Sequence, residues 1–141
     1  MENLTQVLTG TGVGDLAWEV TAGEVPGIEG DDDFLTLISR SQGGHRATSG
    51  FRGPKLHPGD LINYWVGKAI GTPVFVVVRA DPKVDQVAII CLSRARYSLE
   101  LADEVPQFGL RFGAAPVLQG EQVVGVVATS TTERRPVCRY R

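Results

Sequence analysis

The sequence predicts an α/β (α+β) protein with a mixed central sheet and flanking helices. Apolar residues recur at helical spacing over 61–69, after a Pro-Gly-Asp entry and before Gly71-Thr72-Pro73. Two apolar runs follow, Val74–Val78 and Val87–Leu92, and a turn-forming segment at 80–85 separates them. Such runs are typical of strands that are buried on both faces. A helix that leads into a buried hairpin is therefore the centre of the expected fold.

The N-terminal part of the chain adds two strands to this centre. A short helix is expected at Glu2–Thr9 and a glycine-rich connector at Thr9–Gly14. The connector does not match a nucleotide-binding loop, because no apolar strand precedes it and no Lys-Ser/Thr pair follows it. Leu16–Val20 and Phe34–Ser41 alternate like half-buried strands, and Gly23–Asp33 is expected to join them as a hairpin loop.

The remaining segments are assigned by the same patterns. Gln42–His57 is rich in Gly and Arg and predicts an exposed loop or irregular hairpin. Tyr97–Val105 predicts a short helix, and Gly109–Phe112 and Val123–Val127 predict two more strands. The tail 134–141 is basic and is expected to be mobile.

Composition predicts one soluble domain over residues 1–141. An apolar fraction of 43% and a charged fraction of 21% are ordinary for a globular protein. No apolar run is long enough to span a membrane, and no signal peptide is recognisable, so we expect a cytoplasmic protein without a membrane partner. Cys91 and Cys138 are too few for a disulfide framework and are expected to be reduced thiols.

The net charge of −2 hides an uneven distribution of charges along the chain. Residues 1–39 carry eight acids and no Lys or Arg, whereas residues 40–141 carry fourteen bases and eight acids. This polarity indicates either a nucleic-acid-binding face or an ordinary solvated surface with local bias, and charge alone favours the second.

Three charged residues are candidates for catalytic chemistry. Asp15 directly precedes the first predicted strand, Glu19 lies on it, and Arg40 lies near the end of the next strand. Neighbouring strands would bring two carboxylates and a cation to one sheet edge, as in sites that hold Mg²⁺ and orient water against a phosphodiester. Asp15 and Glu19 are therefore the candidate metal ligands. Solvated acids at a strand edge are the alternative.

Several motifs occur in an order that carries a family resemblance. They are Asp15–Glu19, Leu37–Ser41, the Gly/Arg-rich loop, Ile62–Trp65 and Thr72–Pro82. Over residues 13–93 this order resembles uncharacterised bacterial domains allied to the PD-(D/E)XK nuclease superfamily. The resemblance implies a restriction-endonuclease-like core, truncated at its N-terminus, in a bacterial or phage protein. C-terminal strands and the basic tail would follow at 107–141.

The chain departs from the family pattern at two positions of the catalytic motif. Asp15 matches the family's aspartate, but Ile38 replaces an acidic or amide residue and Arg40 replaces a lysine. Isoleucine cannot bind a metal ion, and a permanently protonated arginine can contact phosphate but cannot exchange a proton. The resemblance thus implies a nuclease-like domain with an incomplete motif, a pseudoenzyme that acts by binding.

The loop 42–57 is the predicted binding surface. Arg46, Arg52 and Lys55, with Phe51 among them, are the candidates for contact with DNA or RNA. The ligand would be nucleic acid, or a protein partner in a DNA-transaction or in a defence or anti-defence system. The alternative for these basic residues is that they only keep the loop soluble.

Two other functions remain open. One is an active Mg²⁺-dependent nuclease with a rearranged site, in which Asp15 and Glu19 hold the metal and Arg40 steadies the phosphate. The other is an inhibitor or structural module that docks a protein through an exposed sheet edge at the strand of Trp18. A homo-oligomer is compatible with each of these functions.

Overall fold

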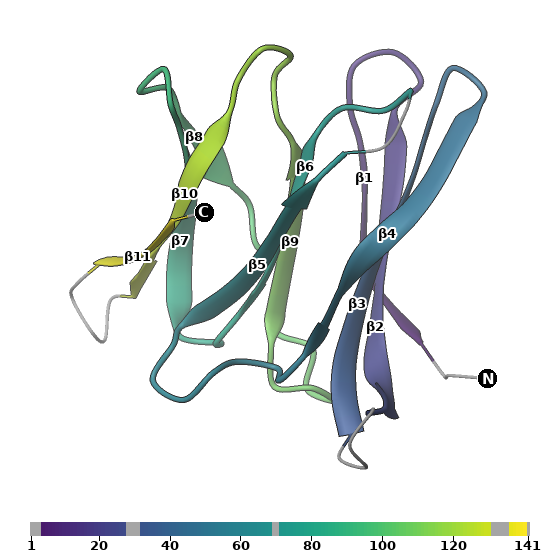
Figure 1. The fold of residues 1–141 in the computed structure, drawn as a ribbon. Helices are drawn as coiled ribbons and strands as arrows, with labels where there is room; N and C mark the ends of the chain where they lie inside the picture. Colours follow the sequence, from purple (N-terminus) through teal and green to yellow (C-terminus); the bar gives the residue numbers. More distant parts are fainter. Residues whose placement is uncertain (1–3, 28–31, 69–70, 131–135, 141) are drawn as a thin grey trace. The chain divides into compact units, whose positions relative to one another are not determined.

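The fold of the chain is known from a computed structural model. It describes residues 4–27, 32–68, 71–130 and 136–140, of which 32 and 136–140 are described by their backbone only. These residues form strands and turns, and no helix occurs among them (Figure 1). No helix capable of crossing a membrane is therefore found in the described part of the chain. The strands in chain order are β1 (Thr5–Thr11), β2 (Ala17–Pro26), β3 (Asp32–Gln42), β4 (His45–Gly53), β5 (Ile62–Gly67), β6 (Phe75–Ala80), β7 (Val84–Cys91), β8 (Arg96–Leu99), β9 (Arg111–Pro116), β10 (Val123–Ser130) and β11 (Pro136–Tyr140).

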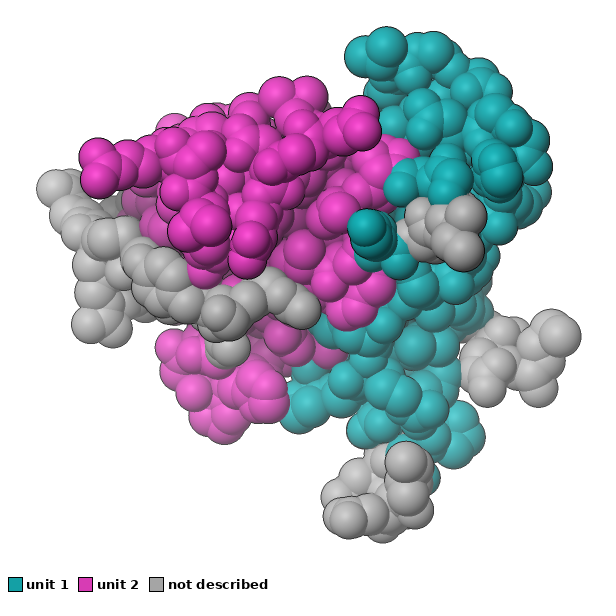
Figure 2. Space-filling view, turned by 45° about the horizontal axis from the view of Figure 1, so that its top comes forward, with its two compact units in different colours: residues 1–55, 68–72 teal, residues 56–67, 73–141 magenta. Residues whose placement is uncertain are grey.

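The strands form three antiparallel sheets. Sheet A has the order β1-β2-β3-β4, sheet B the order β5-β6-β9, and sheet C the order β11-β10-β7-β8. The chain divides into two compact units, which Figure 2 shows in two colours. Unit 1 comprises residues 1–55 with 68–72 and contains sheet A, and unit 2 comprises residues 56–67 with 73–141 and contains sheets B and C.

Unit 2 is a β-sandwich, in which sheets B and C share an apolar core. All six residues of β6 are buried, and Val76, Val78 and Ala80 point into this core. From sheet C, Val87, Ile89 and Cys91 of β7 join them, with Val126 and Ala128 of β10. Each buried Val or Ile side chain stabilises the fold by about 1.5–3 kcal/mol. The predicted strands at Val74–Val78 and Val87–Leu92 are thus confirmed, and so is the turn between them.

Sheet A is a simple meander with one buried face. β2 and β3 pair from Ala17 opposite Ser41 to Pro26 opposite Asp32 without interruption. Because successive side chains of a strand point to opposite faces, one face receives most of the buried residues. The buried face of sheet A carries Val20, Ala22, Phe34, Thr36, Ile38 and Arg40. The other side, which we call the polar face, carries Thr9, Thr11, Glu19, Ser39, Ser41, Arg46 and Thr48 at one end of the sheet and the apolar residues Val25, Leu35 and Leu37 toward the other.

The predicted α/β class, with its flanking helices and restriction-endonuclease-like core, is wrong, because the described chain is all-β. The helix expected at 61–69 is strand β5. Ile62, Tyr64 and Val66 pack against the core of unit 2, which is the period-two pattern of a strand. Apolar residues in so short a segment fit a period of 2 as well as 3.6, and β-branched and aromatic residues favour the strand.

The other two predicted helices are not formed either. Thr5–Thr9, in the helix expected at Glu2–Thr9, belongs to β1, whose three threonines and valine favour a strand. Residues 1–3 lie outside the described part of the chain. Of the helix expected at Tyr97–Val105, Tyr97–Leu99 belongs to β8, and Val105 forms an isolated bridge with Leu110.

The predicted loops are longer than the observed ones, because parts of them belong to strands. The exposed loop or irregular hairpin expected at 42–57 contains β4, which forms a hairpin with β3, and the loop expected at 23–33 contains the end of β2 and the start of β3. In the tail, 136–140 form β11 against β10, whereas 131–135 and 141 lie outside the described residues. The strands expected at Leu16–Val20, Phe34–Ser41, Gly109–Phe112 and Val123–Val127 are confirmed in type, with shifted ends.

Candidate functional site

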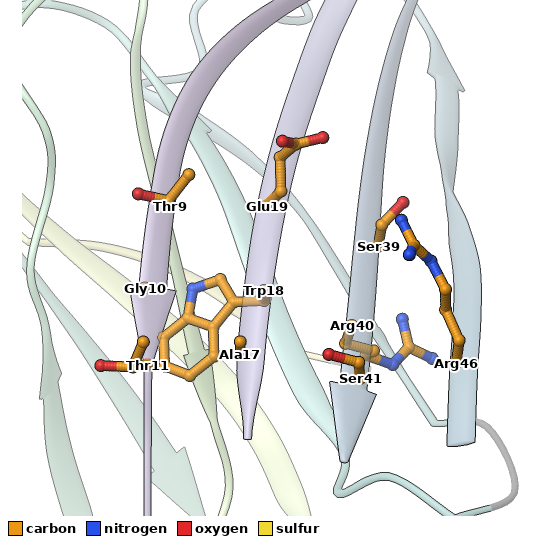
Figure 3. Close-up of a pocket in the computed structure, with 10 residues that line it drawn as sticks. All are labelled: Thr9, Gly10, Thr11, Ala17, Trp18, Glu19, Ser39, Arg40, Ser41 and Arg46. Carbon is orange, nitrogen blue, oxygen red and sulfur yellow. The ribbon is translucent and has the colours of Figure 1, made fainter. Parts of the chain in front are cut away.

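A shallow hollow of about 580 Å³ lies on the polar face of sheet A. All four strands of the sheet contribute to it (Figure 3). The side chains on this face that line it are Thr9, Thr11, Ala17, Glu19, Ser39, Ser41 and Arg46. Four of the seven are hydroxyl side chains and two are charged, so this site suits a polar ligand.

The strand register aligns these side chains in two rows across the sheet. One row runs Thr9–Glu19–Ser39–Thr48 and the other Thr11–Ala17–Ser41–Arg46. Directly opposite side chains of an antiparallel pair lie on the same face, with Cβ atoms about 5 Å apart. The hydroxyls of Ser39 and Thr48 are joined by a hydrogen bond of 2.8 Å. With neighbouring strands about 4.8 Å apart, the four strands present a polar strip roughly 14 Å long.

The floor of the hollow is the backbone of a third row, Gly10–Trp18–Arg40, which lies between the other two. The side chains of this row point to the buried face by alternation. A Cβ atom on Gly10 would collide with the Trp18 indole, so the missing side chain lets the ring lie across β1. None of the seven side chains that face the hollow is aromatic.

Arg46 and Glu19 supply the charges of the hollow. Both are exposed, and neither forms an ion pair with another described residue. In Figure 3 the Arg46 side chain extends along β4 toward Ser39, and Glu19 stands on the far side of β3 from it. The hollow therefore offers one cationic end at β4.

The three predicted catalytic residues are not brought together. Asp15 lies in the turn before β2, and both of its carboxylate oxygens accept hydrogen bonds from the Gly43 backbone N–H at 2.9 and 3.1 Å. Glu19 lies on the polar face, whereas Arg40 pairs with Trp18 and points to the buried face. Asp15 thus fastens the β1–β2 turn to the β3–β4 turn.

Arg40 has a structural environment on the buried face. It is 1% exposed. Its Nη1 donates to Ser49 Oγ at 2.9 Å, and its Nε donates to Thr72 Oγ1 at 3.2 Å. Burial lowers the pKa of the guanidinium, since desolvation disfavours the charged form. These contacts connect β3 to β4 and to the segment 71–72.

The carboxylates of unit 1 do not assemble into a metal centre in this structure. Among the residues whose side chains are described, no three His, Cys, Asp or Glu lie close enough to hold one ion. Asp15 and Glu19, the predicted ligands, face different neighbours. The residues present therefore do not fit the Mg²⁺ site predicted from their place on neighbouring strands.

Two of the three basic residues predicted to bind nucleic acid already interact with other residues of the chain. Arg52 forms an ion pair with Asp33 at 2.9 Å and donates to Pro26 O at 2.7 Å. The Nζ atom of Lys55 lies 3.8 Å from Glu24 Oε1 and 5.6 Å from the centre of the Phe34 ring. Phe51 lies opposite Thr36 and is half-buried. Of the predicted basic set, Arg46 is the one that lines the hollow.

A second hollow of about 600 Å³ lies in unit 2, where Gln86, Arg96 and Ser98 contribute to its lining. The hollow's other arginine, Arg111, is hydrogen-bonded to the backbone of unit 2. The guanidinium donates to three backbone carbonyls, which are Val84 O at 2.8 Å, Ala102 O at 2.9 Å and Leu101 O at 3.3 Å. Each hollow therefore offers one exposed arginine, Arg96 here and Arg46 on sheet A, but the hollow of unit 2 is also lined by the acidic residues Asp85 and Glu100.

Comparison with protein-family models, with curated proteins and with solved structures finds no match to this chain. The kinship with PD-(D/E)XK-related domains stays a prediction for that reason.

Sequence reasoning missed the hydroxyl side chains of the hollow. Thr9-Gly10-Thr11 falls in the segment predicted to be a connector, and the sequence assigns no role to Ser39 or Ser41. The pattern that identifies them is their spacing of two, because residues i and i+2 of a strand share one face. That pattern becomes informative once both segments are strands.

Proposed function

We propose that this chain acts by binding, and that the polar face of sheet A takes the sugar-phosphate backbone of a single-stranded nucleic acid. The observation that carries the proposal is the polar strip that ends at Arg46, with hydroxyls from β1 and β3 along it. Arginine and the hydroxyls of serine and threonine are common donors to phosphate oxygens. A strip of roughly 14 Å accommodates two or three nucleotides.

The charges of the hollow support weak binding without sequence preference. A single phosphate contact at Arg46 contributes little to affinity, and Glu19 repels a second phosphate on its side of β3. Base stacking is not expected, because the indole of Trp18 belongs to the buried face. Binding nucleic acid, rather than cleaving it, also agrees with the separation of Asp15, Glu19 and Arg40.

A fluorescence titration with a labelled oligothymidylate at low salt tests the proposal. We expect Arg46→Ala to weaken binding about fivefold or more, and Arg96→Ala on β8, which also removes an exposed arginine, to leave it unchanged. The dependence of log K on log salt should have a slope near −0.7, which corresponds to one neutralised phosphate on a single strand.

Three outcomes would overturn the proposal. They are no measurable affinity of the native chain, equal affinity of the Arg46→Ala variant, or a steep salt slope that requires several cations. The last would place the nucleic acid on another surface. A protein partner would then be the next ligand class to test.

A further inference from the structure

β1 is an edge strand that has a bulge near its start but neither a charged side chain nor a proline to oppose pairing with another chain. It pairs with β2 alone, and its sequence, Thr-Gln-Val-Leu-Thr-Gly-Thr, contains no charged residue and no proline. Natural sheets protect their edges with charged side chains, prolines, bulges or short strands. Among the described residues, no hydrogen bond is found on the free side of β1.

Four of the other five edge strands differ from β1 because they carry a charged residue. β4 carries Arg46 and Arg52, β8 carries Arg96, and both β9 and β11 contain an arginine and a proline. The remaining edge strand, β5, is also uncharged, but its Tyr64 and Trp65 make further interactions. The expected edge at the strand of Trp18 is thus displaced by one strand, since β1 covers β2.

We propose that β1 pairs with β1 of a second copy of this chain, in an antiparallel two-fold arrangement. A strand without charges meets its own copy without like-charge repulsion. Two-fold symmetry makes antiparallel pairing of identical strands self-complementary, so one surface serves both copies. Pairing centred on Gly10 places Thr9 opposite Thr11 of the second copy, and Thr–Thr pairs across antiparallel strands are favourable.

This pairing joins the binding surfaces of the two copies. Thr9 and Thr11 line the hollow on the polar face, and a two-fold axis perpendicular to the sheet keeps both polar faces on the same side. The two hollows then form one continuous strip with an Arg46 near each end. This consequence rests on the proposed function, whereas the pairing itself depends only on β1.

The geometry of β1 also limits the strength of the pairing. A register shift between Gln6 and Leu8 marks a bulge at Val7, which leaves Leu8–Thr11 as the regular stretch. Four residues a side bury far less area than a permanent interface. The expected dissociation constant is therefore on the order of 0.1 mM.

Sedimentation velocity without ligand, over roughly 10 µM to 1 mM protein, tests the pairing. We expect the native chain to approach the dimer mass at the upper end. The Thr9→Lys/Thr11→Lys variant should stay monomeric, because each lysine would face a lysine of the second copy. Ser98→Lys on β8 adds a cation to another exposed edge strand and should dimerise like the native chain. Equal denaturation midpoints establish that the variants are folded.

Hydrogen exchange identifies the strand involved. On raising the concentration, we expect amides of Leu8–Thr11 to gain protection while those of β4 do not. A native chain that is monomeric at 1 mM, a lysine variant that dimerises equally, or protection confined to another strand would each overturn the proposal. Dimerisation without affinity for oligothymidylate would leave the pairing standing and remove only the proposed function.

Discussion

The core of unit 2 and the buried face of sheet A are equally inaccessible, yet they are built from different side chains. Apolar residues make up the core between sheets B and C. The buried face of sheet A carries two polar residues, Thr36 and Arg40, beside its apolar ones, and they are 0% and 1% exposed. An apolar core gains stability from the area removed from water, whereas a buried polar group must recover its lost hydration through hydrogen bonds.

This difference shows that the burial of a residue does not by itself tell whether the residue stabilises the fold. Arg40 recovers part of its hydration from Ser49 and Thr72. Unit 2 also buries an arginine, Arg79 of β6, but on the face of sheet B that points away from the apolar core. Burial lowers the pKa of Arg79 to about 10. In each unit, the alternation of side chains along a strand decides which residues point to the buried side. Substitutions at two adjacent residues of one strand, one buried and one exposed, therefore test this difference most directly.

The largest effect is expected on β7, where Val87 is 2% exposed in the core of unit 2 and Gln86 is exposed. Val87→Asp places an unpaired carboxylate among apolar side chains and should cost about 4 kcal/mol of unfolding free energy or more. Gln86→Asp, the matched control, should change it by less than about 0.5 kcal/mol. Urea denaturation measures both. Similar losses in the two variants would contradict the alternation of β7.

A smaller effect is expected on β1, where Gly10 faces the buried side of sheet A and Thr9 the polar side. A Cβ atom on Gly10 would collide with the Trp18 indole. Gly10→Val should therefore displace the ring and cost about 1–3 kcal/mol. Thr9→Val should be close to neutral, since both residues are β-branched and favour strands. Trp fluorescence during denaturation reports the stability and the environment of the ring, and an unshifted spectrum in Gly10→Val would argue against the contact.

The sequence predicted the central strands well and the fold class wrongly. Val74–Val78 and Val87–Leu92 were recognisable as strands because short apolar runs rich in β-branched residues favour that structure. The expected burial on both faces is confirmed for β6, whereas β7 is fully buried on one face only. Ile62–Gly67 was not recognisable as a strand, because its six residues fit the spacing of a helix as well as that of a strand. Its secondary structure is decided by pairing with β6, which no local sequence pattern reveals.

The candidate site was less predictable than the strands. Arg46 was identified from its charge, but the ion pairs of Arg52 with Asp33 and of Lys55 with Glu24 depend on the register of β2, β3 and β4. The separation of Glu19 from Arg40 likewise follows from pairing, in which Glu19 lies opposite Ser39 and Arg40 opposite Trp18. A shift of one residue would have placed Glu19 and Arg40 on the same face.

The smallest expected effect concerns a carboxylate of unit 2 that joins two turns, as Asp15 does in unit 1. Glu121 accepts hydrogen bonds from Ser93 Oγ at 2.6 Å and from the Tyr97 hydroxyl at 2.9 Å. The bond to Glu121 raises the pKa of Tyr97 above its ordinary value of 10.0, because a phenolate would lose the bond and face the carboxylate. The folded state thus holds this proton more tightly than the unfolded state, so its contribution to stability is complete below pH 10 and is lost as the pH rises further.

Glu121→Gln removes the negative charge but keeps a side chain of the same size, so the pKa of Tyr97 should fall toward its ordinary value. Alkaline titration of phenolate absorbance measures the change, and subtracting the curve of Tyr97→Phe isolates this residue from the other tyrosines. In the Tyr97→Phe background, Glu121→Gln should leave the remaining tyrosine titration unchanged. If Glu121→Gln leaves the Tyr97 titration where it is in the native chain, the carboxylate does not hold the phenol, and the two turns must be joined chiefly by the backbone bond from Leu92 N–H to Gln122 O at 2.8 Å.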